Sequence, residues 1–148
     1  MAESNTANQL QVILAELRDT DKAKRRTAVM KLGMLGGEEA VTHLIRIVDN
    51  KHEDTIVRAR AAQLLGKLGD TRAVLPLIRA LEAPGYQIPL HAVESLGMLG
   101  DARAIEPLRL IVETKKDRLR EAALKALQRL GHANCESQPD EPLPLPQP

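Results

Sequence analysis

The chain contains 148 residues, the size of one ordinary domain. Its 21 basic and 20 acidic side chains give a net charge of +1, which argues against a nucleic-acid-binding protein that relies on excess positive charge. Trp and Phe are absent and Tyr86 is the only aromatic residue, which excludes an aromatic-walled cofactor site and a stacking platform for single-stranded nucleic acid.

The cysteine content and the hydrophobic segments indicate the cellular compartment of the protein. A single cysteine, Cys135, excludes an intramolecular disulfide framework and fits a reducing environment. No stretch approaches about eighteen uninterrupted apolar residues, and residues 1–7 lack the basic start and apolar run of a signal peptide. We therefore expect a soluble cytoplasmic protein that does not associate with membranes.

Leucine and alanine together supply 42 residues, about 28 % of the chain. Both are strong helix formers, and small alanines opposite leucines let helices approach closely without aromatic filling. Valine and isoleucine stand inside helical patterns instead of alternating as strands require. The composition predicts an all-α protein.

The sequence repeats with a period of about 31 residues. The string Leu-Gly-x-Leu-Gly ends at Gly36, Gly69 and Gly100, and a degenerate copy ends at Gly131. These glycines are 33, 31 and 31 residues apart. An alanine stands eight residues before each glycine, and an arginine or a proline stands eleven before: Ala28, Ala61, Ala92 and Ala123, then Arg25, Arg58, Pro89 and Arg120.

Each repeat predicts two helices. Gly69 and Gly100 are the expected left-handed stops of the first helix, and Asp70 and Asp101 are the expected N-caps of the second. Met34 and Met98 occupy matching repeat positions, so we expect both in the core. Because one helix pair cannot cover its own apolar face, neighbouring pairs must stack.

The chain opens with a half repeat and closes with a single helix, which makes eight helices. The expected segments are a flexible N-terminus at 1–7, a repeat domain at 8–131 (half repeat 8–20, repeats 21–53, 54–84 and 85–115, closing helix 116–131) and a disordered, proline-rich acidic tail at 132–148. Without the three tail acids, the body carries 21 basic and 17 acidic side chains, a charge of +4.

The pattern Val57-Arg58-x-x-Ala61-Ala62-x-Leu64-Leu65-Gly66-x-Leu68-Gly69-Asp70 resembles the short HEAT-like repeat of the phycobilisome-lyase type, and the resemblance covers residues 8–131. It implies a right-handed α-solenoid whose second helices line a concave face used for binding. Bilin-lyase subunits, phycobilisome-degradation factors and adaptors share this repeat, so the resemblance is specific for the fold and poor evidence for one function.

The third repeat is irregular, because Pro89 replaces the repeated arginine and follows Pro84, Gly85 and Tyr86. A proline there starts the helix late or kinks it, and it disfavours helical angles at Ile88. One interpretation is a drifted repeat with a longer loop. A second interpretation is a binding contact formed by this segment, with Tyr86 at the rim of the binding face. A third is that the Tyr86 ring fills the core.

Metal and catalytic sites find little support in the residue pattern. Helical-repeat di-iron hydroxylases use several converging His-Glu pairs, whereas this chain has one, His52-Glu53, in a linker. His91 and Glu94 lack a second pair, and His132-x-x-Cys135 offers only two ligands. No phosphate loop or nucleophile motif is present. We expect no metal, no cofactor and no catalytic residue.

The remaining candidates lie between the buried columns of the second helices. We expect them to form a mixed apolar and basic strip on successive parallel helices: Thr42, His43, Arg46, Leu75, Arg79, Glu106 and Leu110. Such a strip suits a protein partner better than nucleic acid. The sequence therefore predicts a non-catalytic protein-binding scaffold, adaptor or assembly factor, monomeric or a weak homodimer. The alternative is a subunit of a phycobilin lyase or a phycobilisome assembly or degradation factor.

Overall fold

The computed structural model describes residues 2–131, with side chains from residue 5 onward. This part of the chain contains no strand and folds into eight α-helices and two short 3-10 turns, which confirms the all-α solenoid. The α-helices are α1 (Ala2–Leu17), α2 (Lys22–Leu35), α3 (Gly37–Asp49), α4 (Thr55–Leu68), α5 (Val74–Ala80), α6 (Gln87–Leu99), α7 (Ile105–Thr114) and α8 (Asp117–Arg129), and the turns are η1 (Thr71–Ala73) and η2 (Ala102–Ala104).

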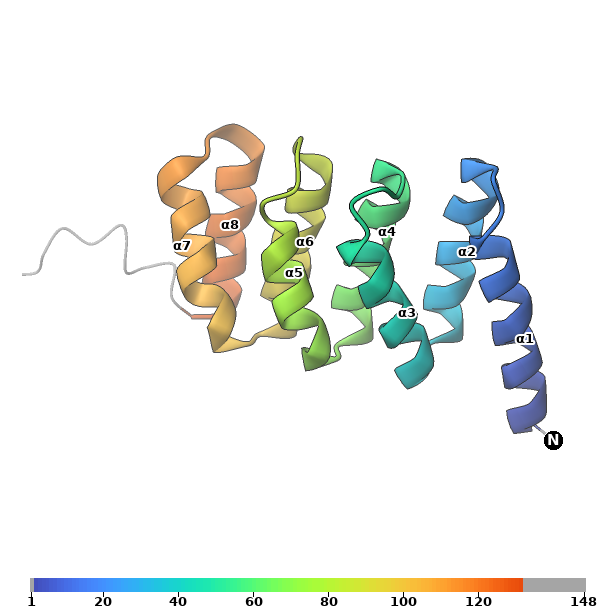
Figure 1. Cartoon of the computed structure of the whole chain (residues 1–148). Coiled ribbons are helices and arrows are strands. Elements are labelled where there is room, and N and C mark those ends of the chain that lie inside the picture. Colours follow the sequence, from blue (N-terminus) through green and yellow to red (C-terminus); the bar gives the residue numbers. More distant parts are fainter. Residues whose placement is uncertain (1, 132–148) are drawn as a thin grey trace, which may run out of the picture.

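The helices form two layers (Figure 1). The even-numbered helices, here called first helices, stack in one row, and the odd-numbered second helices stack in the other. The opening helix α1 belongs to the second-helix row, as the half repeat predicts. It begins at Ala2, so the helix includes residues 2–7, which the sequence analysis placed before the half repeat. Those residues contain neither Gly nor Pro, and the helix extends past its first buried anchor, Leu10.

The expected helix stops and caps are confirmed. Gly69 and Gly100 adopt left-handed backbone angles, with φ of 73° and 68°, and their N–H groups close the last turns of α4 and α6. The carboxylates of Asp70 and Asp101 then accept from the backbone N–H groups of Arg72 and Arg103, each at 2.9 Å. Only two residues, the glycine and the aspartate, therefore separate each of these first helices from the turn that opens the next helix.

The repeated arginine closes the end of the preceding second helix. The Arg58 side chain is buried and donates from Nε and Nη2 to the carbonyl oxygen of Val48, at 3.1 and 2.9 Å. Arg120 donates to Val112 in the same way at 3.2 Å, and Arg25 reaches the carbonyl of Asp19 at 2.9 Å. These carbonyls lie at helix ends, where the helix itself provides no donor.

Pro89 removes this arginine from the third repeat. The preceding helix, α5, ends instead in successive tight turns, in which Leu81, Glu82 and Ala83 donate to carbonyls three residues back. The following helix, α6, begins 13 residues before its terminal glycine, whereas α4 begins 14 residues before Gly69. Pro89 lies in the first turn of α6, where its missing N–H is not needed, so the late start is confirmed. Ile88 is nevertheless helical and buried.

The other repeated glycine allows adjacent first helices to touch. A Cβ atom at Gly66 would lie 2.7 Å from the Cα of Ser95, and one at Gly97 would lie 3.0 Å from the Cα of Ala126. First helices consequently contact one another more extensively than second helices do. In a curved stack, the more closely spaced layer lies on the inner side. This spacing places the first helices there, not the second helices as the family resemblance implied.

The core lies between the two layers and consists of Leu, Ile, Val and Ala side chains. The expectation that Met34 and Met98 belong to it is wrong, because Met34 is 84 % exposed and Met98 is also exposed. Both stand two residues before a terminal glycine. Lys67 and Arg129 occupy the same position in the other repeats and are exposed too.

Candidate protein-binding surfaces

The predicted strip residues all lie on second helices. Thr42, His43 and Arg46 are on α3, Leu75 and Arg79 are on α5, and Glu106 and Leu110 are on α7. We call these seven residues the second-helix strip.

Several polar members of the second-helix strip already have partners. The Thr42 hydroxyl donates to the carbonyl of Glu38 at 3.0 Å. Arg79 pairs with Asp49 at 2.9 Å and so links α5 to the end of α3, and Glu106 pairs with Arg109 at 2.8 Å. Exposed pairs of this kind are weak and can be exchanged for a partner's charges at little cost.

His43 is half-buried at the edge of the strip. Burial, followed by the nearby positive charge of Arg46, holds the pKa of its imidazole below the ordinary value. His43 is therefore neutral near pH 7 and adds no positive charge to the strip.

The apolar members of the strip are open to solvent. Leu75 is 51 % exposed and Leu110 is 57 % exposed. Leu110 and Glu106 line a hollow of about 610 Å³ between α5 and α7, which also exposes parts of Ile78 and Leu81. The second helices are separated enough here for solvent to enter between them.

Tyr86 lies at a different place from the strip. Its ring is 56 % exposed, which excludes a core-filling role, and it lines a hollow of about 390 Å³ between α4 and α6. The other residues around that hollow come from first helices, among them Arg60, His91 and Arg118. The structure therefore does not bring Tyr86 together with the seven strip residues.

A larger hollow, of about 780 Å³, lies between α6 and α8. Leu90, Met98 and Ala122 supply its apolar lining, and three cations and two carboxylates surround them: Arg118, Lys125, Arg129, Glu94 and Glu121. It shares Leu90, Glu94 and Arg118 with the hollow at Tyr86. The two hollows together span three first helices.

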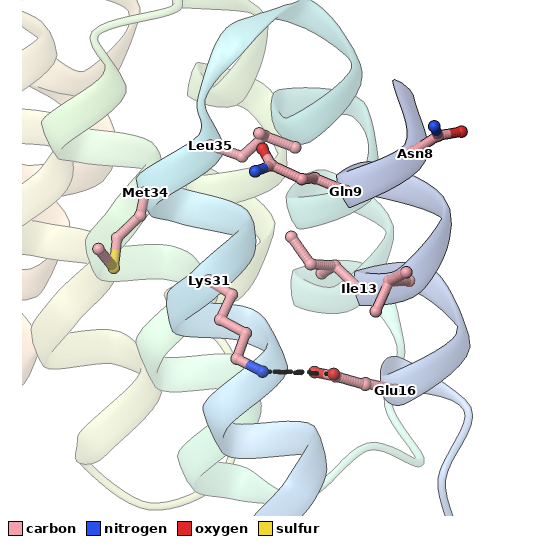
Figure 2. Close-up of a pocket in the computed structure, with 8 residues that line it drawn as sticks. Asn8, Gln9, Ile13, Glu16, Lys31, Met34 and Leu35 are labelled. Carbon is pink, nitrogen blue, oxygen red and sulfur yellow. Dashed lines mark hydrogen bonds and ion pairs between the residues drawn. The ribbon is translucent and has the colours of Figure 1, made fainter. Parts of the chain in front are cut away.

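The most apolar opening is a groove of about 600 Å³ between α1 and α2, which we call the α1–α2 groove (Figure 2). Val12 and Ile13 of α1 and Met34 and Leu35 of α2 provide its apolar surface. Val12 is 59 % exposed. Lys31 reaches across to Glu16 at 3.0 Å and bounds the groove on one side, while Asn8 and Gln9 lie toward the other (Figure 2).

The repeat geometry explains why this groove exists. Leu64, Ser95 and Ala126 stand five residues before their terminal glycines and face the preceding first helix, where they meet Gly33, Gly66 and Gly97. In α2 the same position is Lys31. Within the described residues no first helix precedes α2, so no first helix covers Lys31 and Leu35 on this side. The α1–α2 groove is the place that a preceding first helix would occupy.

Sequence reasoning missed the α1–α2 groove, although one signal was available. Lys31 occupies a repeat position that is buried in the other three copies, and a charge there marks an uncovered helix face. The choice of second helices as the binding layer directed attention away from it.

Over residues 2–131, no three His, Cys, Asp or Glu side chains come together where they would hold a metal ion. None of the helices described is both long and apolar enough to cross a membrane. The pair His132 and Cys135 and the proline-rich tail lie outside the described residues.

Family comparisons agree with the repeat geometry. The family model for HEAT repeats matches residues 48–128, more than half of the chain. This chain belongs to the HEAT-repeat family. The model for the PBS lyase HEAT-like repeat matches residues 24–50 of this HEAT-repeat protein. No curated protein matches it.

Solved structures share the fold. The complex of CpcE and CpcF of phycocyanin lyase from Nostoc sp. PCC7120 aligns with a TM-score of 0.69 and 30% identity, over 82% of this chain and 53% of that chain. Human deoxyhypusine hydroxylase, in complex with glycerol, aligns with a TM-score of 0.70 and 23% identity, over 97% of this chain and 50% of that chain. The HEAT-repeat protein thus spans about half the length of each, and the second likeness shows the fold alone.

Proposed function

We propose that this HEAT-repeat protein is a non-catalytic protein-binding scaffold, and that its α1–α2 groove takes a helix of a partner protein. One observation carries the proposal: the groove exposes apolar side chains at the place where every later repeat receives a neighbouring first helix. The partner helix extends the row of first helices. It packs on Val12, Met34 and Leu35 and displaces the solvent that now covers them.

The repeat itself defines the chemistry of that helix. In the observed interfaces a small residue of one helix meets the facing side chain of the next, as Gly66 meets Ser95. The partner helix therefore carries an apolar stripe with a small residue opposite Lys31. Its edge bears an acidic group that competes with Glu16 for the Lys31 ammonium, now 3.0 Å from the Glu16 carboxylate.

Related architecture supports a protein partner. The Nostoc structure is a complex of two subunits, CpcE and CpcF, of one lyase. The α1–α2 groove suits the same kind of association, because exposed apolar surface beside stacked helices is buried when another helix packs on it.

Site-specific photocrosslinking tests the proposal. A photoreactive amino acid is placed at Met34, at Leu75 in the second-helix strip, or at exposed Lys51, which belongs to neither surface. In extract of the native cell, we expect a specific adduct from position 34 only, and mass spectrometry identifies the crosslinked helix. Adducts from position 75 alone would transfer the proposal to the second-helix strip, and adducts from neither would contradict the scaffold function.

The identified partner then permits a quantitative test. The pair Val12→Glu and Met34→Glu is expected to weaken binding by about tenfold or more, because it places charge on buried apolar contact area. The matched control is Leu75→Glu with Leu110→Glu, which changes two half-exposed leucines on α5 and α7, away from the α1–α2 groove. A stronger loss in the control pair, or in a variant with Arg46, Arg79 and Leu110 changed together, would favour the second-helix strip.

A second candidate function is a subunit of a phycobilin lyase or a factor in phycobilisome assembly or degradation. The match of residues 24–50 to the PBS lyase HEAT-like repeat and the 30% identity to the Nostoc lyase complex favour it. In this function the groove binds a second lyase subunit. Mixing the protein with bilin and an apo-phycobiliprotein, with and without a candidate second subunit, tests it by absorbance. If no mixture transfers or retains chromophore, this function is rejected.

A further inference from the structure

The charges of this chain are segregated along the sequence. Residues 1–114 contain fifteen basic and fifteen acidic side chains and are neutral. Residues 115–131, which include α8, contain six basic and two acidic side chains. Residues 132–148 contain three acidic side chains and no Lys or Arg. The positive excess of the body therefore lies in residues 115–131, which comprise Lys115, Lys116 and the last helix, directly before an acidic segment.

Three of the four cations of α8 lack a partner among the described residues, whereas Arg120 donates to the Val112 carbonyl. Nine of the thirteen arginines donate to a carboxylate or a carbonyl oxygen, for example Arg26 to Asp54 at 2.9 Å. Within residues 2–131, the side chains of Arg118, Lys125 and Arg129 make no hydrogen bond or ion pair. All three line the α6–α8 hollow.

These three cations form a row along one face of α8. Positions 118, 125 and 129 are 7 and 4 residues apart, so they project in nearly the same direction and span about 17 Å at 1.5 Å per residue. Their hollow has an apolar floor of Leu90, Met98 and Ala122, and its other charges are Glu94 and Glu121. Glu94 lies beside His91, with Oε2 at 3.4 Å from Nδ1. The row is available to external carboxylates.

We propose that the acidic segment 132–148 of the same chain docks on the α6–α8 hollow, with Glu136, Asp140 and Glu141 facing the α8 cations. Leu143 and Leu145 supply apolar side chains for the floor of the hollow. This inference concerns a different surface from the α1–α2 groove and does not depend on the proposed function.

The segment is long enough for this contact. Glu141 is the tenth residue after Gly131, and ten extended residues span about 31 Å, whereas the row of cations spans about 17 Å. Because the segment is tethered to the end of α8, its effective concentration at the hollow is on the order of millimolar. Contacts that are weak between separate molecules are therefore populated within one chain.

Paramagnetic NMR on the full chain tests the docking. In a Cys135→Ser background, Leu143→Cys carries a nitroxide spin label, and the methionine methyl groups are isotopically labelled. Met98 lies in the α6–α8 hollow, whereas Met34 lies at the α1–α2 groove and reports on the other end of the solenoid. In about 20 mM salt, we expect severalfold greater broadening of Met98 than in about 0.5 M salt, where charges are screened, and no broadening of Met34.

Three variants with the same label complete the test. We expect the broadening of Met98 to fall severalfold in two of them. One removes the acidic charges of the segment, by Glu136→Gln, Asp140→Asn and Glu141→Gln. The other removes the positive charges of the α8 row, by Arg118→Gln, Lys125→Gln and Arg129→Gln. The matched control removes three exposed cations elsewhere (Arg18→Gln, Arg46→Gln, Lys51→Gln) and leaves the broadening unchanged. Circular dichroism verifies that each variant is folded.

Each contrary result overturns the proposal. Equal broadening of Met98 in the parent and in both charge-removed variants means that the tether alone brings the label near, since an undocked segment of twelve residues keeps it within about 20 Å. Broadening of Met34 places the segment on the α1–α2 groove. Broadening seen only when spin-labelled and isotope-labelled chains are mixed assigns the contact to a second copy.

Discussion

Arg58 and Val48 are joined by two hydrogen bonds, from Nε and Nη2 of the guanidinium to one carbonyl oxygen, at 3.1 and 2.9 Å. The arginine is buried, and the carbonyl lies in the last turn of α3. This contact fixes the end of a second helix to the following first helix. It explains why arginine recurs eleven residues before the terminal glycine.

Replacing Arg58 by Met is therefore expected to destabilise the protein. The change keeps much of the side-chain volume but leaves the Val48 carbonyl without its donor, which costs about 2–3 kcal/mol for a buried charged hydrogen bond. Urea unfolding followed by circular dichroism measures the loss. Arg18→Met is the control, because Arg18 is exposed and makes no side-chain contact of this kind. Equal stability of the two variants would show that the Arg58 contact contributes nothing.

The close approach of α4 and α6 predicts a cost for Gly66→Ala. The added Cβ would lie 2.7 Å from the backbone Cα of Ser95, so the helices must separate, and about 1–3 kcal/mol of stability is lost despite the better helix propensity of alanine. Gly33→Ala is the comparison, because the nearest atoms to its Cβ belong to the Leu64 side chain, which shifts more easily than backbone. Denaturant midpoints should fall further for the Gly66 variant, and the opposite order would contradict this account.

The exposure of Tyr86 predicts that Tyr86→Ala leaves folding nearly intact. With 56 % of the residue exposed, the loss should be within about 1 kcal/mol, well below the cost of removing a buried ring. Thermal unfolding of the single variant measures it. If the hollow between α4 and α6 contacts a partner, the same variant should bind about tenfold more weakly. A large fall in melting temperature would instead show that the ring is structural.

Stability should depend on pH through Asp101. Its side-chain and backbone hydrogen bonds from Arg103 lower the pKa of the carboxyl from 3.8 to about 2. Because the folded-state pKa is the lower one, this carboxylate stabilises the fold above pH 3.8, and the contribution disappears as the pH falls toward 2. Asp101→Asn keeps an acceptor for the backbone N–H of Arg103 but loses the charge.

The pH experiment compares the two proteins directly. The denaturant midpoint of the parent should exceed that of Asp101→Asn near pH 7, and the two should converge at about pH 2. Glu113→Gln serves as a control for loss of an exposed carboxylate without a side-chain partner. A difference that persists unchanged at pH 2 would show that the ion pair with Arg103 is not its cause.

The repeat and its local signals were determined by the sequence alone. The glycine stops, the aspartate caps and the late start of the proline-containing helix follow from backbone angles and hydrogen-bond donors, which depend on a few neighbouring residues. Eight helices and their pairing into repeats were predicted for the same reason. The seven residues of the second-helix strip lie on α3, α5 and α7, and their role in binding stays a prediction.

Only the tertiary structure decided which faces of the helices are buried against neighbours and which remain exposed. Met34 and Met98 lie in regular repeat positions, yet the packing of α2 and α6 leaves them exposed, because helical periodicity fixes which residues share a face and not which neighbour covers it. Likewise, the sequence alone indicates only that Gly66 weakens its helix. The structure shows that Gly66 packs directly against Ser95 of the next first helix. The α1–α2 groove has the same origin, since a surface becomes a binding candidate only when the stack leaves it uncovered.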